Sequence, residues 1–194
     1  AATRRLFTGA TAMVLTQLAM VAVMTMTPVH MQHHGHGLGE IGFVISAHVA
    51  AMFMPSPLTG RLVDRVGRMP MVVASGVTLL AAGLLAATAP GDSMILLTLA
   101  LALLGLGWNF GLIAGTALVV DATPVHTRAR TQGTLDVLVA LAGATGGAAS
   151  GWIVAGASYA TLALCGGLLS LALVPAVVWA QRPRNSVDRP VARA

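Results

Sequence analysis

Charged residues are scarce in this sequence of 194 residues. They make up 9% of the chain, lysine is absent, and only six residues are acidic. Soluble globular domains are about a quarter charged, so this balance argues against a soluble domain. Hydrophobic residues make up 56%, and the single cysteine, Cys165, excludes an intrachain disulfide. The composition therefore predicts an integral membrane protein.

Long apolar runs fill most of the chain. A bilayer core about 30 Å thick needs roughly 20 helical residues per crossing. The runs are continuously apolar and do not alternate, which favours helices over a transmembrane barrel. We expect an all-α integral membrane fold with six transmembrane helices, near residues 6–29, 40–59, 70–89, 94–120, 132–155 and 159–180. Residues 1–180 then form one six-helix unit, and residues 181–194 a disordered cytoplasmic tail.

The arginines indicate how these helices are oriented. Every arginine lies before the first span, between the second and third, between the fourth and fifth, or after the sixth. The other three connections contain none, so the positive-inside rule places both termini in the cytoplasm of a multi-pass protein of the cell (plasma) membrane. The net charge of +5 then reflects contact with anionic lipid headgroups, and no nucleic-acid partner is expected.

One short segment between the second and third spans, GRLVDRVGRMP from Gly60 to Pro70, carries three of the eleven arginines. We expect a loop here, in which Gly60 lets the second helix approach a neighbour closely and Gly67 permits the turn into the third. Asp64 offers a carboxylate to a helix N-terminus or to arginines. A simpler interpretation is that the arginines only anchor the topology.

The segment closely resembles the signature loop of the major facilitator superfamily, roughly G-x-L-x-D-R-x-G-R. The matching residues are Gly60, Leu62, Asp64, Arg65, Gly67 and Arg68. The resemblance implies that Gly60, Asp64, Arg65, Gly67 and Arg68 form a conformational latch, which holds the two halves of a transporter together while it is open to the outside. Pro70 departs from the usual pattern and predicts a more rigid start to the third helix.

A member of this family has twelve helices in two halves, and this chain has six. The fourth span carries no charge, whereas first-half copies commonly carry an arginine there. The run around Trp108 and Asn109 resembles the tenth helix of the family. A set of charges after it resembles a cytoplasmic charge network at the start of the eleventh: Asp121, Arg128, Arg130 and Asp136. The resemblance thus implies the C-terminal half, with an N-terminal half or a second copy of the chain as partner.

By the same analogy, the first and fourth spans line a substrate path. Gln17, Met20 and Met24 follow Met13 along one helical stripe. Trp108 and Asn109 offer stacking and hydrogen bonding. The alternative for each is packing inside the bundle, and the glycines at 107, 111 and 115 are expected to pack against other helices.

Histidines at two places in the sequence are candidates for chemistry. His48 lies within the second span, where an ionisable side chain is costly, so it is a candidate proton relay; the alternative is a neutral, hydrogen-bonded histidine. The connection after the first span holds four further histidines, at 30, 33, 34 and 36. No cysteine lies among them and Glu40 is the nearest acid, so we expect a solvated loop without a metal.

The sequence therefore predicts a secondary active transporter that moves a small, neutral or lipophilic solute by alternating access. The resemblance further implies proton-coupled efflux of drugs. No nucleotide-binding loop and no cofactor are expected. A non-transporting fragment is the alternative. An intramembrane enzyme is disfavoured, because Ser150 lies in only a partial match to a rhomboid-type motif and no histidine follows His126.

Overall fold

The computed structural model describes residues 2–182, and these residues form helices with no strand among them. Six helical stretches of this part are long and apolar enough to cross a membrane: Ala2–His33, Leu38–Val66, Arg68–Thr88, Met94–Ala122, Val125–Gly156 and Tyr159–Gln181. The all-α fold with six membrane helices is therefore confirmed. Of the expected tail, residues 183–194 lie outside the described residues, while Gln181 still belongs to the last helix.

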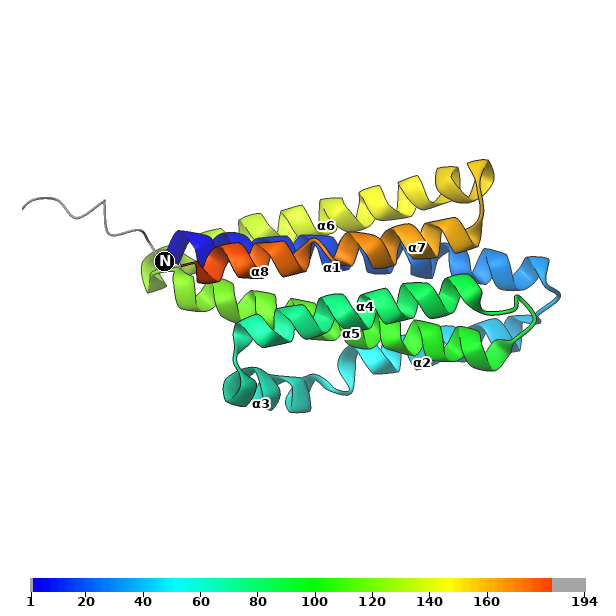
Figure 1. Ribbon diagram of the computed structural model, residues 1–194, viewed down its shortest axis with the longest axis horizontal. Helices are drawn as coiled ribbons and strands as arrows, with labels where there is room; N and C mark the ends of the chain where they lie inside the picture. Colours follow the sequence, from blue (N-terminus) through cyan, green and yellow to red (C-terminus); the bar gives the residue numbers. More distant parts are fainter. Residues whose placement is uncertain (1, 183–194) are drawn as a thin grey trace, which may run out of the picture.

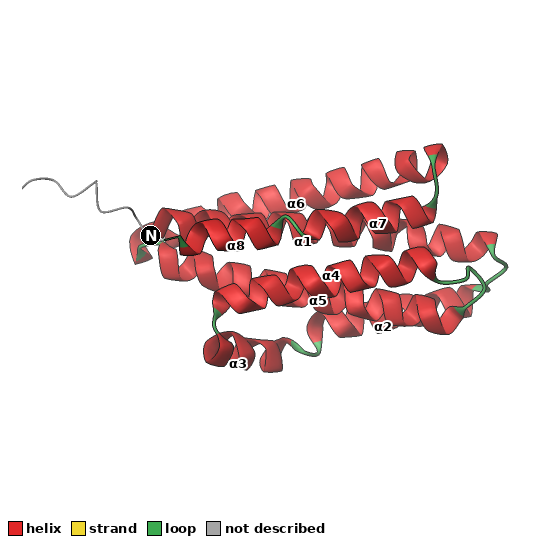
Figure 2. Cartoon of the chain, viewed as in Figure 1, coloured by secondary structure: helices red, strands yellow, loops and turns green. Residues whose placement is uncertain are grey.

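Two of the six stretches are interrupted, which gives eight helices in all within the described part. They are α1 (Ala2–His33), α2 (Leu38–Phe53), α3 (Ser56–Val66), α4 (Arg68–Thr88), α5 (Met94–Ala122), α6 (Val125–Gly156), α7 (Tyr159–Ser170) and α8 (Leu173–Gln181). Figure 2 shows the short breaks between α2 and α3 and between α7 and α8. Prolines explain both, because Pro55 and Pro57 lie at the first break and Pro175 at the second, and none of them can donate a backbone N–H.

The prediction of a loop over residues 60–70 is wrong. Residues 60–66 belong to α3, and Gly67 alone separates α3 from α4. The helix forms because Thr59 and Val63, four residues apart, are both buried on one face while the charged residues lie on the other. The second span consequently runs to Val66 instead of ending near residue 59.

The fifth expected span also begins too late. The helix α6 starts at Val125, seven residues before the predicted boundary, and α1 starts at Ala2 and continues to His33. A span predicted from apolar residues stops where polar residues begin, whereas a helix continues through them until a proline or turn ends it. Pro124 precedes α6 and sets its true start.

The bundle has α1 and α5 at its centre. The helix α5 packs against α1, α2 and α4, while α1 also packs against α6 and α7. In Figure 1, α6 lies along one edge of the bundle and α2 and α3 lie along the other. The start of α1 and the end of α8 lie at one end, and the connections α1–α2 and α4–α5 lie at the other end.

Small residues bring the central helices into close contact. A Cβ added at Gly107 would lie 2.8 Å from Leu79 of α4, and one added at Gly115 would lie 2.9 Å from the Gly9 carbonyl oxygen of α1. Gly111 faces Thr16 and Ser75. The expected packing role of this glycine ridge is confirmed, and it fixes α5 between α1 and α4.

Candidate functional site

The junction between α3 and α4 is a turn of a single residue. Gly67 has φ +103° and ψ 156°, a backbone conformation that residues with a Cβ rarely adopt. Pro70 lies in the first turn of α4, where its missing N–H costs no helical hydrogen bond. Gly60, in contrast, has no atom within 4 Å of an added Cβ, so the close helix approach expected there is not made by any described residue.

An ion pair ties the start of α4 to the end of α5. Arg68 Nε lies 2.9 Å from Asp121 Oδ2, and both side chains are a little over one-third exposed. Asp64 and Arg65 are exposed on α3, and neither forms an ion pair with another residue of the described range. The carboxylate that meets Arg68 inside this unit is thus Asp121, a pairing that the sequence did not indicate.

The other members of the expected cytoplasmic charge network do not join that pair. Arg128 donates to the carbonyl oxygens of Val120 and Thr123 and so caps the end of α5. Arg130 lines a separate hollow between α1 and α6. Asp136 is exposed and forms no ion pair within residues 2–182, although the resemblance places it in the same charge network.

Two of the candidate substrate-path residues contact each other directly. Trp108 Nε1 donates to Gln17 Oε1 at 2.7 Å, which joins α5 to α1 near their middle. The ring of Phe53, at the end of α2, lies edge-on to the Trp108 ring at 5.7 Å between centroids, and Phe53 is itself 58% exposed. Three helices therefore bring aromatic and amide groups together at one place.

The methionines of the stripe are mainly packing residues in this unit. Met20 is buried within the central apolar cluster, and Met24 is partly buried against the same cluster. Met13 is buried beside Val119 and Leu135. The packing alternative considered for these side chains is the one that the geometry of residues 2–182 favours.

Asn109 is also occupied within the unit, at the break between α2 and α3. Its Nδ2 donates to the Met52 carbonyl oxygen at 2.7 Å and to Ser56 Oγ at 2.9 Å, and its Oδ1 accepts from Thr59 Oγ1 at 2.6 Å. Because α2 ends at Phe53, the Met52 carbonyl has no donor in its own helix, and the Asn109 amide supplies one. Sequence reasoning missed Ser56 and Thr59, although the two neighbouring prolines marked the break.

His48 is fully buried where α2 packs on α5. Its Nδ1 lies 2.7 Å from the Leu101 carbonyl oxygen, to which it donates, and its Nε2 is buried without a hydrogen-bond partner among the described residues. The hydrogen-bonded alternative is therefore realised at one ring nitrogen, and the other nitrogen retains the capacity to accept a proton.

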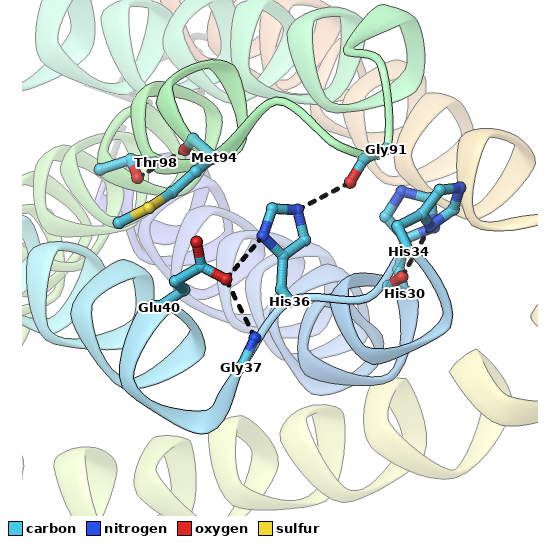
Figure 3. A network of polar contacts seen from close by, with 8 residues as sticks. All are labelled: His30, His34, His36, Gly37, Glu40, Gly91, Met94 and Thr98. Atoms are coloured by element: carbon cyan, nitrogen blue, oxygen red, sulfur yellow. Dashed lines mark hydrogen bonds and ion pairs between the residues drawn. The ribbon is translucent and has the colours of Figure 1, made fainter.

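The histidines at the opposite end of the bundle hold loops together (Figure 3). His36 Nδ1 lies 3.1 Å from Glu40 Oε2, and His36 Nε2 lies 3.0 Å from the Gly91 carbonyl oxygen of the α4–α5 connection. The His30 ring stacks on the ring of Tyr159 of α7, with 4.2 Å between the ring centroids. Residues 2–182 contain no group of three or more His, Cys, Asp or Glu side chains arranged to hold a metal ion.

Comparisons with known proteins agree with this architecture. A family model described as Major Facilitator Superfamily matches residues 9–194. The uncharacterized MFS-type transporters YdeG and YddS of Bacillus subtilis are 67% identical over 173 residues and 64% identical over 171 residues, covering 89% and 88% of this chain. The riboflavin transporter RfnT of Brucella anthropi is 38% identical over 120 residues, which are 62% of this chain and 30% of that protein. The chain spans about 40% of the length of YdeG and 39% of that of YddS.

Proposed function

Since this chain belongs to the major facilitator superfamily, a family of transporters and not of enzymes, we propose that it forms the C-terminal six-helix half of a transporter that works by alternating access. The solute is small and neutral or lipophilic. The helices lie in the cell membrane with both termini in the cytoplasm, because all arginines fall on that side of the predicted topology.

The uneven burial of the six spans is the observation that carries this proposal. In the first and fourth spans 50% of the most apolar stretch is buried, whereas in the second and fifth only 22% is buried. The second span, which consists of α2 and α3, and the fifth span, α6, are thus poorly covered, and they form the two edges of the bundle (Figure 1). A second six-helix half would cover these edges, and the length of the relatives leaves room for one. A second copy of the chain is the other candidate partner.

The latch assigned to α3 and its junction with α4 fits the same arrangement. Asp64 and Arg65 are exposed on an edge helix and have no ionic partner within the described range. Their partners are then supplied by the other half in the outward-open state. Arg68 contributes indirectly, since its ion pair with Asp121 holds the start of α4 against α5.

Trp108, Gln17 and Phe53 support the choice of solute, because they combine flat apolar surface with an amide and carry no charge. These groups suit an uncharged, planar solute. Riboflavin, which one relative transports according to its name, is a second candidate of this kind. Proton-coupled efflux of drug-like compounds remains our first proposal, with His48 as the proton relay.

A comparison of two matched aspartate variants in the native-length protein tests the proposal. Asp64→Asn removes the latch carboxylate, and Asp92→Asn makes the same change in the connection at the other end of the bundle. Uptake or efflux of riboflavin and of lipophilic dyes is measured in membrane vesicles, and surface labelling shows that both variants are inserted. We expect transport to fall at least tenfold for Asp64→Asn only.

Normal transport by Asp64→Asn would remove the latch assignment. Absence of transport of every probe by the unmodified protein, together with a native mass no larger than the 19.7 kDa of this chain, would favour a non-transporting fragment.

A further inference from the structure

An open cavity of about 780 Å³ lies where the start of α1, the start of α4 and the ends of α5 and α8 meet. Four arginines line it, against a single carboxylate: Arg4, Arg5, Arg68, Arg182 and Asp121. Asp121 is already paired with Arg68. The cavity therefore carries an excess of positive charge that no described acidic residue neutralises.

The walls of this cavity are held in place by specific contacts. Arg4 donates through one guanidinium nitrogen to the carbonyl oxygen of Arg182 at 2.9 Å, and its guanidinium carbon lies 5.3 Å from the centre of the Trp179 ring. The Phe7 ring lies edge-on to Trp179 at 5.7 Å. These contacts join the first turn of α1 to the last turn of α8, so the arginines stand on two helices fixed to one another.

The remaining lining makes the cavity amphipathic. The first turn of α4, after the positive-φ Gly67, contributes backbone N–H groups that have no acceptor in their own helix and a partial positive charge. Met69, Pro70 and Leu118 add apolar surface beside them. Guanidinium groups and helix N-termini are the groups that proteins use to bind phosphate, and apolar surface next to them suits the glycerol and acyl part of a lipid.

We propose that this cavity binds the phosphate headgroup of an anionic phospholipid of the cytoplasmic leaflet. The proposal rests on the proposed orientation, which places these ends of the helices at the cytoplasmic surface. The cavity lies at the ends of four helices and therefore at headgroup depth, where basic pockets between membrane helices bind acidic lipids. A lipid bound there would stabilise the contact between the α1–α8 pair and the α4–α5 pair.

Lipid binding is tested on the native-length protein purified in an uncharged detergent. Dioleoyl phosphatidylglycerol, dioleoyl phosphatidylcholine and inorganic phosphate are titrated separately and in competition, with bound lipid read by native mass spectrometry. We expect saturable binding of phosphatidylglycerol only. Arg5→Gln and Arg182→Gln should each weaken it about fivefold, the effect of one basic residue near an anionic surface. Arg61→Gln, an exposed arginine of α3 outside the cavity, is the matched control and should leave binding unchanged.

Three results would overturn the proposal. Equal losses for Arg61→Gln and Arg5→Gln would show only diffuse attraction to negative charge. Equal binding of phosphatidylcholine would show that headgroup charge is not recognised. Displacement of phosphatidylglycerol by inorganic phosphate that itself binds as tightly would show a site for a soluble anion. The measurement reads bound lipid and not transport, so its failure is distinguishable from failure of the proposed transport function.

Discussion

Replacement of Asn109 by leucine should destabilise the protein strongly, because one amide makes three hydrogen bonds across the break between α2 and α3. Interhelical hydrogen bonds in membrane proteins average about 0.6 kcal/mol, which gives about 2 kcal/mol for three. The Met52 carbonyl and the Thr59 hydroxyl are then left without a partner, and a buried unpaired polar group costs about 1–3 kcal/mol. Because the penalty for an unpaired group already includes its lost bond, the two groups together give an expected loss of about 2–6 kcal/mol.

The loss is measured as the free energy of unfolding of the purified native-length protein in mixed micelles. Thr59→Val removes one of the three bonds at similar volume and should cost about a third as much. Ser46→Ala removes a hydroxyl bonded within α2, to the Gly42 carbonyl, and should stay within about 0.5 kcal/mol of the unmodified protein. Full stability of Asn109→Leu, or an equal loss for Ser46→Ala, would refute the role of Asn109 as a clamp on the helix break.

Three further outcomes are expected. Gly83→Ala should lower the free energy of unfolding by about 1–3 kcal/mol, because its Cβ would lie 2.5 Å from the Ala163 carbonyl oxygen, whereas Gly151→Ala, with nothing within 4 Å, should be neutral; equal effects would contradict the close packing of α4 on α7. His48→Gln should flatten the pH dependence of transport, since glutamine can still donate to the Leu101 carbonyl but takes up no proton; an unchanged profile would dispose of the relay. His36→Ala should speed amide hydrogen exchange around Gly91 about fivefold, the equivalent of losing one hydrogen bond. The control is His33→Ala, which should leave exchange unchanged because the exposed His33 side chain makes no polar contact within residues 2–182. Equal exchange rates in the two variants and the unmodified protein would show that His36 does not hold this loop.

The number and type of membrane helices followed from the sequence, because a span in lipid must be apolar along its whole length and this signal is local. The ends of the helices did not follow, since α1 and α6 continue through polar residues beyond the apolar run. The prediction of a loop over residues 60–70 was wrong for a related reason. Glycine and arginine suggested a turn, while the four-residue spacing of Thr59 and Val63 already indicated a helical face.

The contacts between candidate residues were harder to predict. The sequence indicates both Trp108 and Gln17 as candidates, but their hydrogen bond joins residues 91 positions apart and depends on α1 lying beside α5. The arginine pattern predicts that Arg68 and Asp121 lie on the same side of the membrane, but the resemblance assigns Arg68 to the latch and Asp121 to the charge network, and it does not indicate their ion pair. A single sequence gives the side on which a charge lies, and the choice of partner is made by packing between distant helices.

The single residue between α3 and α4 has a mechanical consequence. A longer connection would absorb movement, but here two helices share one pair of soft dihedral angles, at Gly67. Any tilt of α3 relative to α4 is therefore confined to the dihedral angles of Gly67, next to Arg68, which pairs with Asp121 at the end of α5. The exposed residues Asp64 and Arg65 thus lie only a few residues from an ion pair that reaches the central helix of the bundle.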